Sequence, residues 1–344
     1  MSALPATLTR AADSLYAGID VGGTNIKIGL VDDMGRTVAF QSLATESDRG
    51  PTDAAARMGA TIKSLCTQCD VAPGRVARVG LATPGPLDVA AGLILCPGNL
   101  PAWHDAPIRD LVAEACGRPV TFANDANAAA YGEYWRGTGQ AARCMVMLTM
   151  GTGIGGGIVV DDLLVEGRHG CGAELGHVVI DCRNDAPLNS LGIRGTLEGY
   201  CGAYGTTARA VAAVELGANT TLGQRFAQGE ELTPLVVAQE AEAGDATALE
   251  IVMDTARYMA LGVVTAIHAI DPDCVVIGGA ATFGGAGHPL GERFLARLRE
   301  ETERRLIPSP RGKIEISFAR LGSDAGYIGA AGLARRDALA AGDR

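Results

Sequence analysis

Short apolar segments alternate with turns rich in glycine and polar residues, and this pattern predicts a chain of strands and helices. Near the N-terminus, residues 16–21, 25–31 and 37–44 are apolar segments of strand length. A Gly-Gly-Thr turn and a polar turn at residues 32–35 join them, which predicts an antiparallel meander. Residues 1–14 lack such a pattern and are expected to form a disordered leader.

Strands and helices then alternate along the rest of the chain, which predicts the α/β fold class. Residues 200–268 are expected to be mostly helical, with a break near residues 217–229 and a boundary at residues 242–246. A final helix is expected at about residues 328–344. The other predicted helices lie at residues 52–69 and 107–116, and the other predicted strands at residues 78–82, 87–89, 93–96, 120–123, 274–277 and 314–319.

The first hairpin carries groups suited to phosphate. Gly22 and Gly23 lack Cβ atoms, so their amides can approach an anion, and with Thr24 they predict a nest of donors. Asp20 is expected to hold Mg²⁺, through water, and Lys27 to face the same ligand. The chain continues into a strand rather than a helix, which excludes a P-loop or a dinucleotide fingerprint. An ordinary glycine hairpin is the structural alternative.

Residues 144–161 repeat this plan about 130 residues later, with a turn built from Thr149, Gly151, Thr152 and Gly153. Two matched hairpins predict a duplicated architecture in which two domains bind one polyphosphate. This arrangement resembles the actin-like ATPase fold of the hexokinase and Hsp70 type, with a cleft between the domains. Gly278 and Gly279, after a buried strand, are expected to lie against an adenine.

The length of 344 residues also suggests two domains. We expect a small α/β domain over residues 15–123, completed by the C-terminal helix at about residues 328–344, and a large α/β domain over residues 124–327. An apolar share of 47% is ample for two cores.

Charge and cysteine content narrow the function classes. The net charge of −10 and the absence of a basic run argue against a nucleic-acid partner. The sequence shows neither a signal peptide nor an apolar run long enough to span a membrane. Nine widely spaced cysteines fit free thiols in a reducing cytoplasm. We therefore expect a cytoplasmic protein that acts on a small molecule.

Two polar pairs are candidates for the chemistry. Asn124 and Asp125 follow a predicted strand, where α/β folds place ligands, although either could simply cap the following helix. Glu174 and His177 are three residues apart and project from one face of a helical turn. The second pair alone fits half a metal site, a buried histidine or a pair of sugar-hydroxyl ligands.

Taken together, these stretches resemble the ROK family of bacterial sugar kinases and repressors, and its glucokinases most, over about residues 15–332. The resemblance implies phosphorylation of a hexose, with glucose giving glucose 6-phosphate, and ATP and Mg²⁺ as cofactors. It also implies a homodimer, and it makes Asp125 the catalytic base. The sugar-binding residues that it implies are Gly85, Asn99, Asn124, Asp125, Glu174, His177 and Glu198.

One departure from the family pattern concerns zinc. The family usually carries three cysteines that bind a structural zinc with the histidine, and here Asn189, Leu191 and Thr196 stand at those positions. A tetrahedral site needs four ligands and His177 alone remains, so we predict no zinc. The loop at residues 182–194 must then be held by packing, or it is mobile until sugar binds. A displaced metal site remains an alternative, with nearby cysteines at Cys171, Cys182 and Cys201.

Several alternatives stay open. The hexose could be an N-acetylhexosamine, mannose, fructose or allose, and polyphosphate could replace ATP. A ROK-type sugar-sensing regulator would add an N-terminal helix-turn-helix, for which the segment before Leu15 is too short and the charge too acidic. An actin-fold ATPase that acts as a chaperone or activator would lack the Asn-Asp and Glu-x-x-His pairs.

Overall fold

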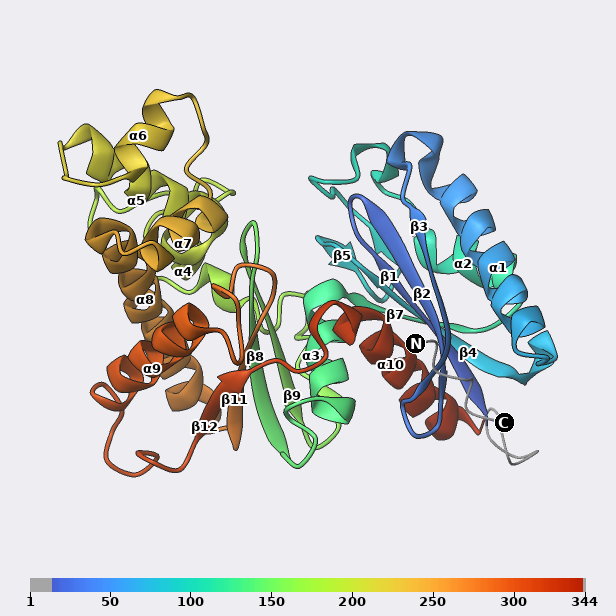
Figure 1. Ribbon diagram of the computed structural model, residues 1–344. Coiled ribbons are helices and arrows are strands. Elements are labelled where there is room, and N and C mark those ends of the chain that lie inside the picture. The colour runs from blue at the N-terminus through green and yellow to red at the C-terminus, as the bar shows by residue number, and fades with distance from the viewer. Residues whose placement is uncertain (1–13, 343–344) are drawn as a thin grey trace. The chain divides into compact units, whose positions relative to one another are not determined.

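The computed structural model describes residues 14–342, which form two compact units that each contain a five-stranded sheet (Figure 1). The first unit runs up to Gln140 and also includes Leu164–Gly172 and the chain from Ser323 onward. The second unit consists of Ala141–Leu163 and Ala173–Gly322. The predicted leader lies almost wholly outside the described residues.

The sheet of the first unit has the strand order β3-β2-β1-β4-β7. Strands β1, β2 and β3 pair antiparallel, which confirms the predicted meander, and β4 and β7 continue the sheet in parallel with β1. The strands are β1 (Leu15–Val21), β2 (Asn25–Asp32), β3 (Thr37–Ala44), β4 (Val76–Thr83) and β7 (Val120–Asn124), beside a small hairpin of β5 (Leu87–Asp88) and β6 (Leu93–Ile94). The helices are α1 (Gly50–Gln68), α2 (Ile108–Cys116), α3 (Asp125–Arg136) and α10 (Ala325–Ala341), with short 3-10 turns at Ser47–Arg49, Pro73–Arg75, Pro101–Trp103 and Gly322–Asp324.

The alternation of side chains in β1 explains how helices cover both faces of this sheet. Ala17, Ile19 and Val21 are buried in one apolar core with residues of α1 and α2. The intervening positions, Gly18 and Asp20, face α10. A Cβ on Gly18 would lie 1.9 Å from the carbonyl oxygen of Tyr327 in that helix, so the absence of a side chain permits the close packing.

The second unit repeats the arrangement with the strand order β10-β9-β8-β11-β12. Strands β8 and β9 form the antiparallel hairpin, and β11 and β12 extend the sheet in parallel with β8, as β4 and β7 do with β1. The strands are β8 (Cys144–Met150), β9 (Ile154–Val160), β10 (Leu163–Leu164), β11 (Cys274–Gly278) and β12 (Glu315–Phe318). The helical elements are η4 (Leu175–His177), α4 (Leu197–Cys201), α5 (Ala203–Glu215), α6 (Leu222–Ala227), α7 (Pro234–Glu242), α8 (Ala246–Ile270) and α9 (Pro289–Glu303).

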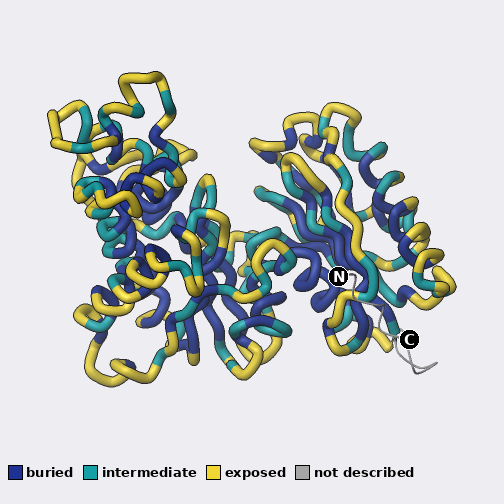
Figure 2. The backbone as a smooth tube through the Cα atoms, in the orientation of Figure 1, coloured by how far each residue is buried: buried dark blue, intermediate teal, exposed yellow. Residues whose placement is uncertain are grey.

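The central strands of both sheets are buried and the connecting loops are exposed (Figure 2). The predicted helical region agrees with α4 to α8, although the expected break contains the short helix α6. Helix α9 was not predicted from the sequence. The first unit extends past the predicted division between residues 123 and 124, because α3 packs against α10.

Candidate active site

The carboxyl ends of three parallel strands bring candidate residues of the first unit to one sheet edge. Asp20 on β1 is the register partner of Ala82 on β4, and Thr83 is the partner of Asn124 on β7. A Cβ placed on Gly85 would lie 3.4 Å from Nδ2 of Asn124. Three residues predicted independently from the sequence therefore share this edge, which is where parallel α/β sheets bind ligands.

The first glycine turn lies beside another candidate, Asn99. A Cβ on Gly23 would lie 3.4 Å from the Asn99 side chain, so these two residues are neighbours. One expectation about this turn is wrong. The amide of Gly22 donates to the carbonyl oxygen of Asn25 at 2.8 Å, so it closes the turn and is not a free phosphate donor. Gly23 and Thr24 are exposed, and their amides make no hydrogen bond to a described residue.

The Asp20 carboxylate is largely removed from water. Burial raises the pKa of Asp20 to about 6, and the positive charge of Lys27 on β2 opposes that rise. Lys27 is the register partner of Asp20, and its Nζ donates to the carbonyl oxygen of Ser323 at 2.5 Å. A bound cation would favour the charged form of Asp20, so this group fits Mg²⁺ chemically.

Asn124 and Asp125 begin helix α3 in different roles. Oδ1 of Asn124 accepts from the amides of Ala126 at 2.9 Å and Asn127 at 3.3 Å, so Asn124 is the N-cap. Asp125 is the first helical residue, is half-buried, and accepts from the Ala126 amide at 2.8 Å. The capping interpretation thus holds for Asn124. The cap also fixes the backbone that carries the Asp125 carboxylate.

The second glycine turn lies between β8 and β9. The Gly151 amide closes this turn by donating to the Gly153 carbonyl oxygen at 2.9 Å, so it too is unavailable to phosphate, contrary to expectation. The Ala203 amide of α5 donates to the carbonyl oxygens of Gly151 and Thr152, both at 3.1 Å. The amides of Thr152 and Gly153 make no hydrogen bond within the described chain.

The predicted adenine-binding glycines lie next to this turn. Gly278 at the end of β11 is the register partner of Thr149 on β8. Gly279 has a φ of 94°, and a Cβ there would lie 2.2 Å from the carbonyl oxygen of Met150. The structure therefore groups the predicted phosphate and adenine residues of the second unit around the ends of β8 and β11.

Glu198 lies under the same turn and uses both carboxylate oxygens within the protein. Oε2 accepts from the Ile154 amide at 3.2 Å. Oε1 accepts from the hydroxyls of Ser190 at 2.7 Å and Tyr204 at 2.9 Å. Burial acts to raise the pKa of Glu198, but these hydrogen bonds outweigh it and hold the pKa below its ordinary value. Ser190 and Tyr204 carry no motif signal and were not predicted.

Glu174 and His177 lie at the two ends of the single turn η4. His177 Nε2 is 3.7 Å from Oε2 of Glu174, and His177 Nδ1 is 3.0 Å from Nδ2 of Asn189. A Cβ on Gly176 would lie 2.0 Å from the carbonyl oxygen of Ile154, so this turn packs directly on β9. Glu198 and the turn that carries His177 therefore both contact Ile154 at the start of β9.

The residues at the family's zinc positions do not fit a zinc ion. Leu191 is 69% exposed and offers no ligand atom. Thr196 is buried, and its hydroxyl caps α4 by accepting from the Gly199 amide at 3.3 Å. In residues 14–342, no group of three or more His, Cys, Asp or Glu side chains could hold a metal ion. Cys201 is buried with its thiol facing the carbonyl oxygen of Thr255, and the thiol of Cys182 is exposed.

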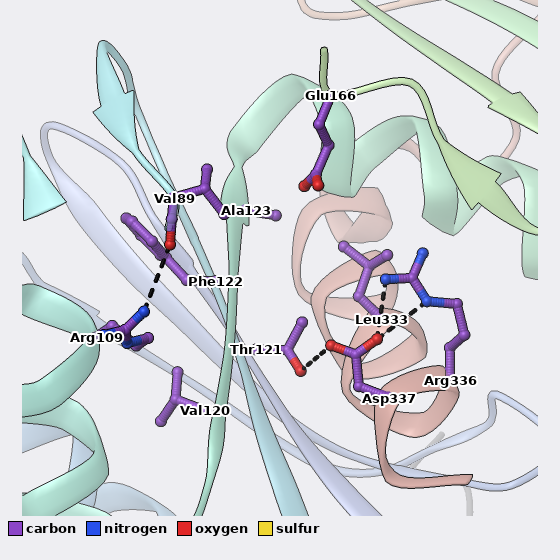
Figure 3. Close-up of a pocket in the computed structure, with 10 residues that line it drawn as sticks. All are labelled: Val89, Arg109, Val120, Thr121, Phe122, Ala123, Glu166, Leu333, Arg336 and Asp337. Carbon is purple, nitrogen blue, oxygen red and sulfur yellow. Dashed lines mark hydrogen bonds and ion pairs between the residues drawn. The ribbon is translucent and has the colours of Figure 1, made fainter. Parts of the chain in front are cut away.

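A cavity of about 190 Å³ in the first unit lies away from the predicted residues (Figure 3). Its walls come from β7, α2, α10 and the segment around Glu166, whose carboxylate Figure 3 shows above the Asp337–Arg336 pair. Asp337 accepts from Thr121 at 2.8 Å and from Arg336 Nε at 3.1 Å. Burial raises the pKa of Glu166. None of the predicted catalytic, sugar-binding or nucleotide-binding residues lines this cavity.

No helix within the described residues has the length and apolar character needed to cross a bilayer.

Comparisons with known proteins identify a family and a fold for this chain. A profile of the ROK family matches residues 16–337. A glucokinase from Thermotoga maritima is 33% identical over 317 residues, which are 92% of this chain and 96% of that protein. The crystal structure of a ROK hexokinase from Thermus thermophilus is 31% identical, with a TM-score of 0.80 over 95% of this chain and 99% of that one. A ROK glucokinase from Streptomyces griseus, solved with glucose and AMPPNP, is 31% identical with a TM-score of 0.72 over 94% of this chain and 100% of that one.

The similarity extends to regulators. A xylose repressor from Caldicellulosiruptor bescii is 28% identical over 78% of this chain, but the match covers only 64% of the repressor. The kinases match along nearly their whole length, and the two-unit architecture is that of their actin-like ATPase fold.

Proposed function

Since the chain belongs to the ROK family, we propose that it is an ATP-dependent hexose kinase, with glucose as its first candidate substrate. The Thermotoga maritima glucokinase, the Thermus thermophilus hexokinase and the Streptomyces griseus glucokinase all match along nearly their full length. The observation that carries the proposal is the shared sheet edge of the first unit. There Asp20 lies near the end of β1, and Asn124 ends β7 and is followed by Asp125. The glycine turn after β1 has exposed amides that face no described acceptor.

Asp125 is the proposed general base. A sugar hydroxyl is a poor nucleophile, so Asp125 accepts its proton while the hydroxyl oxygen forms a bond to the γ-phosphorus and the bond to ADP breaks. General-base catalysis of this kind contributes about 10²–10⁴ in rate. The N-cap at Asn124 supports this role because it fixes the first turn of α3.

Backbone amides from both units are the proposed phosphate donors. In the first unit they come from Gly23 and Thr24, and in the second from Thr152 and Gly153. Aimed donors of this type stabilise charge on a transferring phosphoryl group. Mg²⁺ near Asp20 would add a positive charge to the same group when bound. Lys27, Thr149, Gly278 and Gly279 complete the proposed nucleotide-binding set.

The proposed sugar-binding residues divide between the units. Gly85, Asn99, Asn124 and Asp125 belong to the first, and Glu174, His177 and Glu198 to the second. In this proposal the Glu198 carboxylate has two roles. It holds the Ser190 loop and the turn before β9 in place, and it also contacts the sugar. Its fixed negative charge makes it a hydrogen-bond acceptor at neutral pH.

The experiment that tests the proposal is a coupled assay of ADP release over a panel of glucose, mannose, fructose, allose and N-acetylhexosamines. Sugar-dependent ADP release supports a kinase, and the best sugar identifies the substrate. ADP release that is independent of sugar would favour an actin-fold activator instead. Sugar binding without any phosphate transfer from ATP or polyphosphate would favour the regulator.

A further inference from the structure

The side chain of Asn189 occupies the first cysteine position of the family's zinc pattern and is buried in the structure. Its Oδ1 accepts hydrogen bonds from the backbone amides of Leu191 at 3.0 Å and Ile193 at 2.8 Å. Its own backbone amide donates to the Ile193 carbonyl oxygen at 2.9 Å. Asn189 therefore closes the turn that runs through the positions at which the family pattern carries cysteines.

These contacts fix the direction of the Asn189 amide. Backbone N–H groups only donate, so the side-chain atom that faces them must be the carbonyl oxygen. The NH₂ group then points at His177, where Nδ2 lies 3.0 Å from Nδ1 of the ring. An amide NH₂ donates and does not accept, so Nδ1 of His177 must be the unprotonated, accepting nitrogen.

We infer that Asn189 holds His177 as the neutral tautomer protonated at Nε2, and that it does so in place of a metal ion. A metal that binds one ring nitrogen of a histidine leaves the other nitrogen as an N–H donor. The NH₂ group of Asn189 produces the same ring state by hydrogen bonding. Asn189 is thus a positioning residue, and the loop keeps its form without zinc.

The inferred tautomer has a consequence that rests on the proposed function. His177 Nε2 is 3.7 Å from Oε2 of Glu174, which is too long for a direct hydrogen bond. The His177 side chain is 28% exposed, so its Nε2–H can donate to a ligand. A fixed donor beside a carboxylate acceptor matches a sugar hydroxyl, or two neighbouring hydroxyls, that must both accept and donate.

The test is long-range ¹H–¹⁵N NMR on the full chain labelled with ¹⁵N-histidine, without ligand and near neutral pH. The signals of His177 are assigned by their loss in His177→Gln. A protonated Nε2 beside an unprotonated Nδ1 supports the inference. A protonated Nδ1, or two tautomers in exchange, overturns it.

Two substitutions at Asn189 and one control test whether Asn189 itself sets the tautomer of His177 or whether the loop as a whole does. In Asn189→Asp, the introduced carboxylate accepts a hydrogen bond, so His177 should become protonated at Nδ1. In Asn189→Ala, the ring loses its partner and both tautomers should appear. Leu191→Ala, in the same turn but with an exposed side chain, should keep the wild-type signals. Unchanged His177 signals in both Asn189 variants would contradict the inference.

Activity and metal content provide the remaining readouts. Asn189→Ala should raise the KM for the sugar about threefold to tenfold, as expected for one misdirected hydrogen bond. Purified protein should contain no stoichiometric zinc, and chelator should leave the His177 signals unchanged; bound zinc whose removal alters them would refute the inference. Should no sugar be phosphorylated, the proposed function fails, while the NMR result still decides the tautomer.

Discussion

The Asp20 carboxylate lies in the space that a side chain on Gly326 would fill. A Cβ placed on Gly326 would be 2.4 Å from Oδ2 of Asp20. Gly326 is buried in the first turn of α10, so the contact joins the end of β1 to the start of the C-terminal helix. Helix α10 therefore lies directly beside the candidate metal-binding carboxylate, although Asp20 and Gly326 are more than 300 residues apart in the sequence.

Gly326→Ala should therefore impair activity by displacing Asp20. The added methyl group must push either the carboxylate or α10 away, and overpacking of this kind costs about 1–3 kcal/mol. We expect the apparent KM for Mg²⁺-ATP to rise, while the KM for the sugar changes less. Gly223→Ala in α6 is the matched control, because its Cβ would meet no atom closer than 3.9 Å. Equal Mg²⁺-ATP kinetics in the two variants would contradict the role of this contact.

Asp20→Asn should stabilise the metal-free protein while it abolishes Mg²⁺-dependent activity. Burial raises the pKa of Asp20 from 3.8 to about 6, so the folded state favours the neutral carboxyl. That preference stabilises the wild type fully below about pH 4 and is lost as the pH rises through about 6. The difference of about 2 pKa units corresponds to about 3 kcal/mol.

The measurement is denaturant unfolding of both proteins without metal at pH 4.5 and pH 7.5. The free energy of unfolding of Asp20→Asn relative to wild type should increase between these values, by up to about 3 kcal/mol. Saturating Mg²⁺ should stabilise the wild type alone. A stability difference that does not vary with pH would show that Asp20 is not desolvated in the folded protein.

Asp125→Asn tests the proposed base. The amide keeps the size of the side chain but cannot accept a proton, so kcat should fall at least about a hundredfold. Sugar binding, measured by calorimetry, should change little. Asn124→Ala is a useful comparison, because loss of the N-cap should lower the free energy of unfolding by about 1 kcal/mol. A near-normal kcat in Asp125→Asn would refute the assignment.

The sequence predicted the parts of the fold that depend on local patterns. The two glycine hairpins and the positions of most strands follow from short-range periodicity and turn chemistry, and the structure contains them. The parallel pairing of β1, β4 and β7 joins distant segments and was not predicted, and the sequence left open whether Asn124 or Asp125 caps α3. Helix α9 was not predicted, although Leu290, Phe294 and Leu298 recur at helical spacing and its sequence does carry the periodic signal. Residues that act through distant contacts gave no signal: Gly326 is one helix residue among many until β1 places Asp20 against it.

The use of backbone amides was predictable only in part. A Gly-Gly-Thr turn suggests free donors, yet the sequence does not say which amide closes the turn. The structure assigns that role to Gly22 and Gly151, which leaves their neighbours for a ligand. In the same way, the absence of three cysteines predicted a loop without zinc, but the hydrogen bond between Asn189 and His177 depends on the folded path of the loop and had no signal in the sequence.

Glu198 links the Ser190 loop to the second glycine turn, and its variants should separate this structural role from the proposed contact with sugar. Glu198→Gln keeps the shape of the side chain but replaces one acceptor oxygen by a donor NH₂. An NH₂ group cannot accept a hydrogen bond. Either the Ser190 and Tyr204 hydroxyls or the Ile154 amide therefore lose their acceptor, depending on which oxygen is replaced. We expect a higher KM for the sugar, a smaller change in kcat, and a loss of about 1–3 kcal/mol in unfolding free energy.

Tyr204→Phe is the sharper variant, because it removes one hydroxyl and leaves the Glu198 carboxylate with its remaining partners. That hydroxyl donates to Glu198 and accepts from the Ser190 amide, so two hydrogen bonds are lost. The free energy of unfolding should fall by about 1–3 kcal/mol, and the KM for the sugar should rise less than in Glu198→Gln. If Glu198 contacted no sugar and only supported the loop, the two variants would change KM in proportion to their loss of stability. A sugar KM that is unchanged in Glu198→Gln, for every sugar tested, would exclude Glu198 from the sugar-binding set.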